Sequence, residues 1–369
     1  MNRPHKPRVL LVSNRADDMG GGEFSLLLLL EGLVEGGQAT PVLAVPAPGE
    51  VSNRAADLGI EIVELPLPRI RFQPWRLPLA IDRAKQVIEA VGPEVVHANG
   101  SRAMLIAGSA AAKRGIPTIW HVRVEGSDPL DRRLLRKASA IVTPSRAVAA
   151  RFPEGDPQVV YNPVAIPEIP TGEPDPLDWI VPADEESWLI LVVGEISPNK
   201  GQDRVLEGLL RLQTERPWHL LIAGEGIGGE KSFVRQLAGR AWDSGVGDRV
   251  HFLGFREDIS QIMLRADLIV QASRSEGFGR VYVEAMAHGI PTVVTDAGGL
   301  AELFELTGYG WQAGQGSAEE LSVAIAAALA DDAGRSRCRT EGPKLAESHF
   351  SVATHTARIV DIYTRLSRP

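Results

Sequence analysis

Residues 273–302 read SRSEGFGRVYVEAMAHGIPTVVTDAGGLAE. The apolar run at residues 267–272 comes just before them and predicts a buried parallel strand. A glycine-containing loop follows, then a helix that ends at Gly289 and Pro291, and then a second strand from Thr292 to Thr295. This succession of strand, glycine loop, helix and strand predicts a parallel α/β sheet.

The loop after the first of these strands has the composition of an anion-binding site. Gly277 and Gly279 let the backbone approach a ligand closely. The free amides in the first turn of the following helix favour an anion, and Arg280 adds positive charge there. Glu276 and Glu284 supply carboxylates, which accept hydrogen bonds from sugar hydroxyls. Each glutamate alone is equally typical of a solvated surface, but two of them beside an anion site indicate a nucleotide sugar.

The same stretch resembles the signature of glycosyltransferase family 4, a group of retaining enzymes with the GT-B fold. The resemblance is carried by the motifs Glu276 to Gly279, Glu284 to Ala287, Gly289 to Pro291, and Thr295 to Gly299 with Glu302. It implies two Rossmann-like, doubly wound parallel-sheet domains that face each other across a cleft. It also implies transfer of a sugar from a UDP- or GDP-sugar to a glycan, lipid-linked or small-molecule acceptor, in cell-surface polysaccharide or glycolipid biosynthesis.

Length and composition limit the function further. The 369 residues are enough for two domains, and a net charge of −8 gives no general attraction to nucleic acid. The single cysteine, Cys338, excludes an internal disulfide and fits a reducing compartment. No apolar run approaches the ~20 residues of a membrane-spanning helix. We therefore expect a cytoplasmic protein and leave open a peripheral contact with the inner face of the membrane.

Strand and helix patterns alternate along nearly the whole chain, and the Pro-rich, acidic residues 166–186 predict a linker between two domains. The resemblance implies that residues 1–165 form an acceptor-side Rossmann-like domain, completed by a C-terminal helix within residues 350–369. It also implies that residues 187–349 form the donor-binding domain. The other strands are expected at residues 8–14, 40–45, 61–65, 95–98, 118–122, 140–143, 188–193, 219–223 and 249–253.

Candidate residues of the first domain follow the ends of predicted strands, where ligands bind in parallel sheets. The glycine-rich turn with Gly21, Gly22 and Glu23 suits phosphate, although such a turn is as often merely flexible. The resemblance implies that His121 lies close to the donor sugar and takes part in catalysis. The acceptor-side candidates are His97, Asn99, Ser101 and Arg123. A lone histidine on a strand is otherwise typical of hydrogen-bonded packing.

The second domain contains the pattern Gly194 to Gly201, which resembles a family element whose arginine and lysine clamp the diphosphate. Lys200 matches the lysine, but Glu195 replaces the arginine, and a carboxylate repels a pyrophosphate. Either Arg280 supplies the missing charge or Glu195 points away. The predicted catalytic residues are Glu276, His121 and Lys200. The predicted donor-binding residues are Gly21, Gly22, Glu23, Gly194, Lys200, Gly224, Gly226, Phe255, Arg256, Glu276, Gly277, Phe278, Gly279, Arg280 and Glu284.

No HExxH motif, cysteine cluster or carboxylate cage indicates a metal site, so no metal is expected and no cofactor apart from the nucleotide sugar. Residues 66–79 combine arginines with Phe72 and Trp75. Such a segment suits a membrane interface or a lipid-linked acceptor, or it forms an ordinary loop with a packed tryptophan. Two rival functions remain open: a GT-B nucleotide-sugar epimerase, and a degenerate nucleotide-sugar-binding protein, which Glu195 favours.

Overall fold

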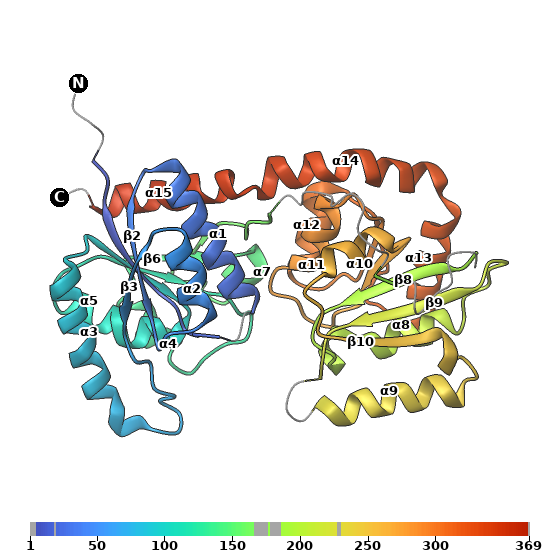
Figure 1. The fold of residues 1–369 in the computed structure, drawn as a ribbon, viewed down its shortest axis with the longest axis horizontal. Helices are drawn as coiled ribbons and strands as arrows, with labels where there is room; N and C mark the ends of the chain where they lie inside the picture. Colours follow the sequence, from blue (N-terminus) through green and yellow to red (C-terminus); the bar gives the residue numbers. More distant parts are fainter. Residues whose placement is uncertain (1–4, 18–19, 166–175, 178–185, 227–229, 368–369) are drawn as a thin grey trace. The chain divides into compact units, whose positions relative to one another are not determined.

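The structure, a computed structural model, describes residues 5–17, 20–165, 176–177, 186–226 and 230–367. The chain forms two compact units: Met1–Val164 with Phe350–Pro369, and Ala165–His349. Figure 1 shows a parallel sheet with helices in each unit. The predicted linker at residues 166–186 lies largely outside the described residues.

The first unit is built on seven parallel strands in the order β3-β2-β1-β4-β5-β6-β7. Their bounds are β1 Arg8–Val12, β2 Thr40–Val45, β3 Glu61–Glu64, β4 Val95–Asn99, β5 Thr118–His121, β6 Ala140–Thr143 and β7 Gln158–Val159. The order reverses between β1 and β4, as in doubly wound sheets. The six longer strands were predicted to within two residues at each end. The two residues of β7 are too short to produce a periodic pattern.

Helices cover both faces of this sheet because successive strand residues point to opposite sides. Leu10 and Val12 of β1 pack in a cluster with α3, whereas Val9 and Leu11 pack in a cluster with α1 and α15. The helical elements are α1 Gly21–Gly36, α2 Glu50–Asp57, η1 Pro74–Arg76, α3 Leu77–Val91, α4 Ser101–Ala103, η2 Met104–Gly108, α5 Ser109–Ala112, α6 Asp131–Leu135, α7 Arg146–Ala149 and α15 Val352–Ser367.

The C-terminal helix α15 belongs to the first unit and packs against α1. Gly32 of α1 makes this contact close: a Cβ there would lie 2.2 Å from Oγ1 of Thr356. The apolar side chains Ile359, Ile362 and Tyr363 of α15 are buried against the rest of the first unit.

The second unit repeats the same topology with six parallel strands in the order β10-β9-β8-β11-β12-β13. The strands are β8 Trp188–Val193, β9 Trp218–Ala223, β10 Val250–Gly254, β11 Leu268–Gln271, β12 Thr292–Val294 and β13 Trp311–Gln312. The reversal lies between β8 and β11. The predicted fold class of two Rossmann-like parallel-sheet domains is therefore confirmed.

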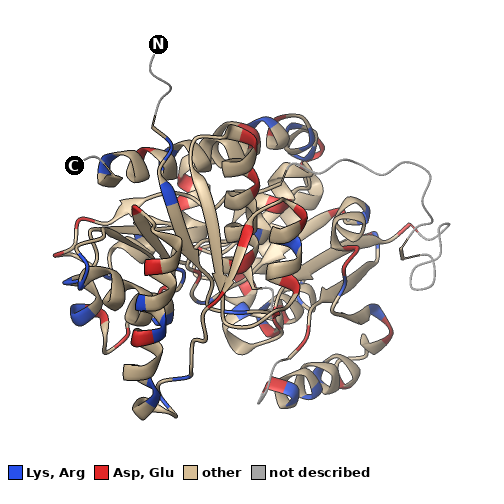
Figure 2. Ribbon diagram, turned by 60° about the vertical axis from the view of Figure 1, so that its left-hand side comes forward, with Lys and Arg blue, Asp and Glu red and all other residues tan. Residues whose placement is uncertain are grey.

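Helices again cover both faces of the second sheet. Ile190 and Val192 of β8 pack in a cluster with α8 and α13, and Leu189 and Leu191 pack in a cluster with α10 and α11. The helical elements are η3 Pro198–Lys200, α8 Gln202–Leu209, α9 Lys231–Asp243, η5 Gly247–Arg249, α10 Ile259–Arg265, α11 Arg280–Ala287, α12 Gly299–Thr307, α13 Ala318–Ala330 and α14 Asp332–Phe350. Charged residues lie mainly on helices and loops, while most strand residues are uncharged (Figure 2).

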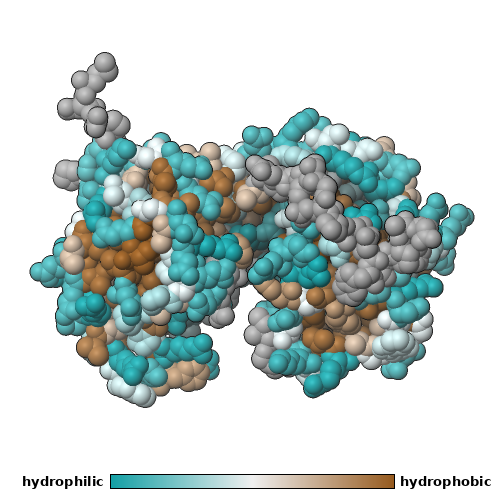
Figure 3. Space-filling view, in the orientation of Figure 1, coloured by the Kyte–Doolittle hydropathy of each residue, from teal (hydrophilic) through white to brown (hydrophobic). Residues whose placement is uncertain are grey.

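The structure excludes one of the two forms that were predicted for the basic and aromatic segment at residues 66–79. It ends in the short helix η1 and the first turn of α3, at the light-blue foot of the first unit in Figure 1. The side chain of Trp75 is 71% exposed, so the alternative of a packed tryptophan is wrong. The visible face of both units is otherwise mainly hydrophilic, with separate hydrophobic patches (Figure 3).

Candidate functional site

Two of the predicted residues of the second unit, Lys200 and Glu276, meet at the carboxyl ends of β8 and β11. These two strands are neighbours at the point where the strand order reverses. Ligands of open parallel sheets bind just outside such a reversal, because the loops there diverge and leave room between them. The loop after β8 carries Lys200, and the loop after β11 carries Glu276.

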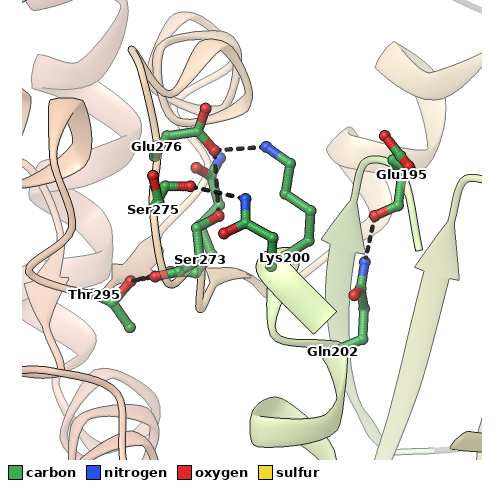
Figure 4. A network of polar contacts seen from close by, with 9 residues as sticks. Glu195, Lys200, Gln202, Ser273, Ser275, Glu276 and Thr295 are labelled. Carbon is green, nitrogen blue, oxygen red and sulfur yellow. Dashed lines mark hydrogen bonds and ion pairs between the residues drawn. The ribbon is translucent and has the colours of Figure 1, made fainter. Parts of the chain in front are cut away.

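Lys200 and Glu276 form an ion pair at this point. The Nζ of Lys200 lies 2.6 Å from Oε2 of Glu276, and the side chains are 31% and 16% exposed. The hydroxyl of Ser273 donates a second hydrogen bond to the same carboxylate oxygen, at 3.2 Å. Figure 4 shows the two charged side chains reaching toward each other from different loops. Both groups therefore stay partly accessible while they orient each other.

Hydrogen bonds between the two loops fix the positions of this pair. The side-chain amide of Asn199 donates to the carbonyl of Ser275 at 3.0 Å, and the backbone N–H of Arg274 donates to the carbonyl of Asn199 at 2.7 Å. Thr295, at the end of β12, donates to the carbonyl of Ser273 at 2.8 Å. Sequence reasoning missed these supporting residues because their role depends on contacts between distant loops.

Glycines allow the loops to approach each other. Gly201 has a φ of +71°, and a Cβ there would lie 2.1 Å from the carbonyl oxygen of Ala272. Gly224, after β9, has a φ of +142°, and a Cβ there would lie 1.9 Å from the carbonyl oxygen of Gly194. A Cβ on Gly226 would meet Val234. The structure thus gives Gly194, Gly224 and Gly226 a role in close backbone packing beside the site.

Glu195 replaces the clamp arginine and does not join the ion pair. Its carboxylate is exposed and forms no hydrogen bond or ion pair with any described residue. Only its backbone carbonyl is held, by the side-chain amide of Gln202 at 3.0 Å. In Figure 4 the Glu195 carboxylate lies apart from the ammonium of Lys200. Gln202 is fully buried and links the loop after β8 to the start of α8.

The helix α11 begins beside the same loop, after Gly279 with a φ of +99°. A guanidinium nitrogen of Arg280 lies 2.6 Å from Oε1 of Glu284, one turn further along. The two predicted ligand-binding side chains are therefore partners of each other. Sequence reasoning treated them as separate contacts, although the four-residue spacing is typical of helical ion pairs.

The role of Phe278 in donor binding stays a prediction. Its side chain is buried and faces the protein interior. Its backbone closes the turn instead, since a Cβ on Gly299 would lie 2.6 Å from the Cα of Phe278. The N–H of Gly299 also donates to the carbonyl of Glu276 at 2.6 Å. The ring of Phe278 thus anchors the loop that carries Gly277.

The predicted residues after β10 lie at the edge of the sheet, two strands away from the reversal. Phe255 is exposed. Arg256 forms a two-contact ion pair with Asp258, at 2.7 and 2.5 Å, and these hydrogen bonds lower the pKa of the Asp258 carboxyl. The side chain of Arg256 is therefore oriented along its own loop, and the role of Phe255 and Arg256 in donor binding stays a prediction.

In the first unit, predicted residues meet at the reversal between β1 and β4. Arg123 donates from Nε to Oδ1 of Asn99 at 2.7 Å and from a terminal nitrogen to Oδ1 of Asn162 at 2.6 Å. The stem of Arg123 lies against Gly22, since a Cβ on that glycine would come within 3.4 Å of it. The amide of Asn99 donates to the carbonyl of Gly22 at 3.4 Å. Asn162 is an addition that the sequence did not reveal.

Glu23 and Ser101 lie at the starts of helices around this cluster. Glu23 is in the first turn of α1, after Gly21 and Gly22, and its side chain is buried. Burial raises the pKa of the Glu23 carboxyl, and the charges of Arg15 and Arg123 offset this only in part. Ser101 begins α4 directly after β4 and is half-buried.

The two predicted histidines are buried next to each other. Nε2 of His97 lies 3.0 Å from Nδ1 of His121, and Nδ1 of His97 lies 2.6 Å from the hydroxyl of Tyr363. Because both ring nitrogens of His97 are occupied and the ring is fully buried, its prediction as an acceptor-side contact is wrong. Nε2 of His121 has no hydrogen-bond partner among the described residues. Burial lowers the pKa of His97 to about 3 and that of His121 well below its usual value.

Two family models match the chain. "Glycosyltransferase Family 4" matches residues 19–166 and "Glycosyl transferases group 1" matches residues 175–345. Within the described residues, no helix combines the length and apolarity needed to cross a membrane. The described part of the chain also gathers no group of three or more His, Cys, Asp or Glu side chains able to hold a metal ion.

Curated relatives match mostly over part of their length. The chain is 32% identical over 180 residues to the lipopolysaccharide core biosynthesis mannosyltransferase LpsB of Rhizobium meliloti, a match that covers 47% of this chain and 51% of LpsB. It is 39% identical over 131 residues to mannosylfructose-phosphate synthase of Agrobacterium fabrum, covering 34% of this chain and 28% of that enzyme. The lipopolysaccharide core biosynthesis glycosyltransferase LpsE of Rhizobium meliloti is 25% identical over 94% of this chain and 95% of its own.

Solved structures support the fold. HepE of Anabaena in complex with UDP has a TM-score of 0.81 and 23% identity, with 97% of this chain and 100% of that chain covered. A glycosyltransferase from Rickettsia africae has a TM-score of 0.81 and 18% identity, with 98% of each chain covered. With both halves matched by the two family models and the double Rossmann-like architecture in place, the chain belongs to glycosyltransferase family 4 and has the GT-B fold.

Proposed function

We propose that the protein is a retaining glycosyltransferase that moves a hexose from a UDP- or GDP-sugar to a glycan, lipid-linked or small-molecule acceptor. The observation that carries this proposal is the pairing of Lys200 with Glu276 at the reversal between β8 and β11, beside the start of α11. A cation and a helix start suit a diphosphate, and a carboxylate suits sugar hydroxyls. The pathway we assign is lipopolysaccharide or other cell-surface polysaccharide biosynthesis.

The pairing of Lys200 is compatible with a role at the diphosphate. An ammonium group has three N–H donors, and the Lys200 ammonium uses one of them toward Glu276. The other two are available to phosphate oxygens, whose negative charge grows as the glycosidic bond to the leaving nucleotide breaks. Glu276 then holds Lys200 in position and offers its other oxygen to the sugar. We assign hydrogen bonds with the ribose hydroxyls to Glu284.

We propose that this charge stabilisation needs no metal ion and no cofactor besides the nucleotide sugar. Lys200, Arg280 and the amides at the start of α11 together supply the positive charge that phosphate oxygens require. In the first unit, Asn99, Ser101 and Arg123 are assigned to the acceptor. The start of α1 with Gly21, Gly22 and Glu23 suits an anionic group of a substrate.

The relatives support the substrate class. LpsB and LpcC are described as mannosyltransferases of lipopolysaccharide core biosynthesis, and HepE was crystallised with UDP-glucose. These names favour a nucleotide-activated hexose as donor and a growing surface glycan as acceptor. Because LpsB is covered over only about half its length, the sugar and the acceptor are proposals for this chain.

The exposed segment at residues 69–79 supports a place at the inner face of the cytoplasmic membrane. Three of its apolar side chains are unusually exposed, namely Phe72 (67%), Trp75 (71%) and Leu79 (73%). Arg69, Arg71 and Arg76 lie close to them in the sequence and are also exposed. Aromatic rings enter the headgroup region, and arginines attract anionic lipids. We propose that this segment brings the first unit to a lipid-linked acceptor.

Arg15 and Arg102 are further basic residues, and they lie just after β1 and β4, where the strand order of the first sheet reverses. The pKa of the Arg102 guanidinium is lowered by its burial and by the nearby charges of Arg69 and Arg15. Arg102 lies on α4, directly after β4. Arg69 and Arg15 each lie close enough to repel Arg102, and Glu23 offsets this only in part. Such a group of arginines favours a ligand with phosphate groups, which a lipid-linked sugar diphosphate would provide.

A donor screen tests the proposed function. Purified protein is incubated with UDP- and GDP-hexoses, with and without extracted glycolipid acceptor, and the released nucleotide is measured. Transfer requires acceptor-dependent release, and NMR of the product must show the anomeric configuration of the donor. An epimerase would convert the sugar without releasing nucleotide. A degenerate binding protein, which the exposed Glu195 favours, would bind nucleotide and turn over nothing. Activity in excess chelator tests the proposed independence from metal ions.

A further inference from the structure

A chain of three buried side chains lies behind the carboxyl end of β5. Tyr363 of α15 contacts Nδ1 of His97 on β4 at 2.6 Å, and Nε2 of His97 contacts Nδ1 of His121 on β5 at 3.0 Å. All three side chains are essentially inaccessible to solvent. Two hydrogen bonds thus connect the C-terminal helix to the predicted catalytic histidine, His121.

The protons of Tyr363, His97 and His121 can be placed by counting the hydrogen-bond donors and acceptors of the three side chains. Both imidazoles are neutral near pH 7, because burial lowers the pKa of each ring far below that value, so each ring carries one N–H. The Tyr363 hydroxyl is protonated, because burial raises its pKa. Two directions of hydrogen bonding are then consistent with the distances.

In the first direction, Tyr363 donates to His97, His97 donates to His121, and the proton of His121 stays on Nε2. One polar group, that N–H, is then without a partner among the described residues. In the second direction, His121 donates to His97 and His97 donates to Tyr363. The Tyr363 proton and the Nε2 lone pair of His121 then both lack partners, because His97 is the only hydrogen-bond partner of Tyr363 among the described residues. The first direction leaves fewer buried polar groups unsatisfied and is therefore favoured.

We infer that Tyr363 and His97 are positioning residues that hold His121 in the tautomer with its proton on Nε2, so that it presents an N–H donor to a substrate oxygen. The carboxyl end of β5, where His121 lies, is the side of the sheet on which ligands bind. A buried N–H without a partner is costly, and a hydroxyl or phosphate oxygen of the substrate would satisfy it. The catalytic meaning of this donor rests on the proposed transferase function.

The tautomer can be measured without any turnover. Protein labelled with ¹⁵N in its histidine rings gives long-range ¹H–¹⁵N spectra that distinguish protonated from unprotonated ring nitrogens, and the His121→Gln variant assigns the His121 signals. We expect Nε2 of His121 to be protonated and Nδ1 unprotonated. A proton on Nδ1 in the unaltered protein would overturn the inference, whatever the enzyme's activity.

The Tyr363→Phe variant tests whether the chain of hydrogen bonds sets this tautomer. It removes one hydroxyl and retains the ring, so the second tautomer of His121 should become populated. Turnover should fall roughly tenfold, the factor that about 1.4 kcal/mol in the barrier produces, while the KM for donor stays unchanged. Tyr282→Phe, a buried tyrosine of the second unit with its own hydrogen bonds, should leave the His121 signals unchanged.

Two variants of His97 give a second test if Tyr363→Phe does not fold. A glutamine at 97 can accept from Tyr363 through its oxygen and donate to His121 through its nitrogen, so His97→Gln should keep the tautomer and most of the turnover. His97→Leu can do neither and should lose both. If the spectra and turnover number of both His97 variants, or of Tyr363→Phe, match those of the unaltered protein, the positioning role is refuted. Absence of transferase activity with any donor would refute the proposed function and leave the spectral result to decide the tautomer.

Discussion

The ammonium of Lys200 lies 2.6 Å from the carboxylate of Glu276, although 76 residues separate them along the chain. The contact exists because β8 and β11 are neighbours and because Gly201 lets the first loop pass against the carbonyl of Ala272. In a partly buried site, an ion pair of this kind orients both side chains before a ligand arrives. The residue proposed to bind the sugar and the residue proposed to bind the diphosphate are thus fixed relative to each other.

We expect Glu276→Gln to reduce the transfer rate by roughly two orders of magnitude, because it removes a charge-assisted hydrogen bond to the sugar in the transition state. Affinity for the nucleoside diphosphate should change little, since glutamine still offers an oxygen to Lys200. Turnover and nucleotide affinity are measured by nucleotide release and calorimetry. Glu207→Gln is a matched control, because Glu207 pairs with Arg211 and Arg240 on the surface of the same unit. Near-normal transfer by Glu276→Gln would refute the assigned role.

Arg280 and Glu284 are expected to act as a coupled pair. If Arg280 contacts the diphosphate, Arg280→Ala should weaken binding of the nucleoside diphosphate by ~1.5–3 kcal/mol, the range for hydrogen bonds to charged groups. The 2.6 Å contact with Glu284 adds a second effect: the freed carboxylate loses its orientation, so binding of the nucleoside should also weaken, by a smaller amount. Calorimetry on both single variants and the double variant gives the coupling energy. Equal losses for nucleoside and nucleoside diphosphate would show that Arg280 is only structural.

Trp75→Ser is predicted to weaken binding to vesicles that contain anionic phospholipid. The residue is 71% exposed and lies between arginines, so it can insert into the headgroup region while they contact lipid phosphates. Co-sedimentation with phosphatidylglycerol vesicles measures the binding, and it should weaken further with added salt. Trp242→Ser is the matched control, because Trp242 is similarly exposed on α9 of the second unit. Equal binding by the two variants would contradict the proposed membrane contact.

Much of the fold could be predicted because both sheets repeat one pattern. Central strands such as β8 are continuous apolar runs, and each is followed by a glycine turn and a helix. The short strands β7 and β13, of two residues each, were missed, because two residues produce no periodicity. Their positions are set by pairing with a neighbouring strand, which a single sequence does not encode locally.

The site was predictable residue by residue but not as a network. The loops with Lys200 and Glu276 were identified from glycines and charges, yet their ion pair depends on which strands are neighbours. The wrong expectation for His97 and the inward-facing ring of Phe278 have one cause: His97 lies within β4 and Phe278 in the loop after β11, and both side chains point into the protein. Whether a residue at a strand end faces ligand or core depends on packing, and for His97 the packing partner, Tyr363, is 266 residues away.

The buried histidines predict how the first unit responds to acid. His355 of α15 donates from Nδ1 to the carbonyl of Tyr161 at 2.7 Å, and burial lowers its pKa to about 3. In the unfolded chain a histidine titrates near its usual pKa of about 6.5. Its contribution to stability is therefore fully present above pH 6.5 and is lost progressively as the pH falls toward 3, because only the unfolded state takes up the proton.

As the pH falls through this window, each such histidine should reduce the free energy of unfolding by about 1.4 kcal/mol per pH unit. We therefore expect His355→Gln to flatten the pH dependence of the first unit's stability by about that amount between pH 6 and 5. This range lies below the usual histidine pKa of about 6.5 and above the usual pKa of carboxylates. Urea-dependent hydrogen exchange, read by mass spectrometry on peptides from β4 and β5, measures the first unit separately. Thr356→Val is the control, since it alters a neighbouring buried side chain without a titrating group and should keep the slope. A slope that is unchanged in His355→Gln would mean that this ring takes up a proton while the unit is still folded.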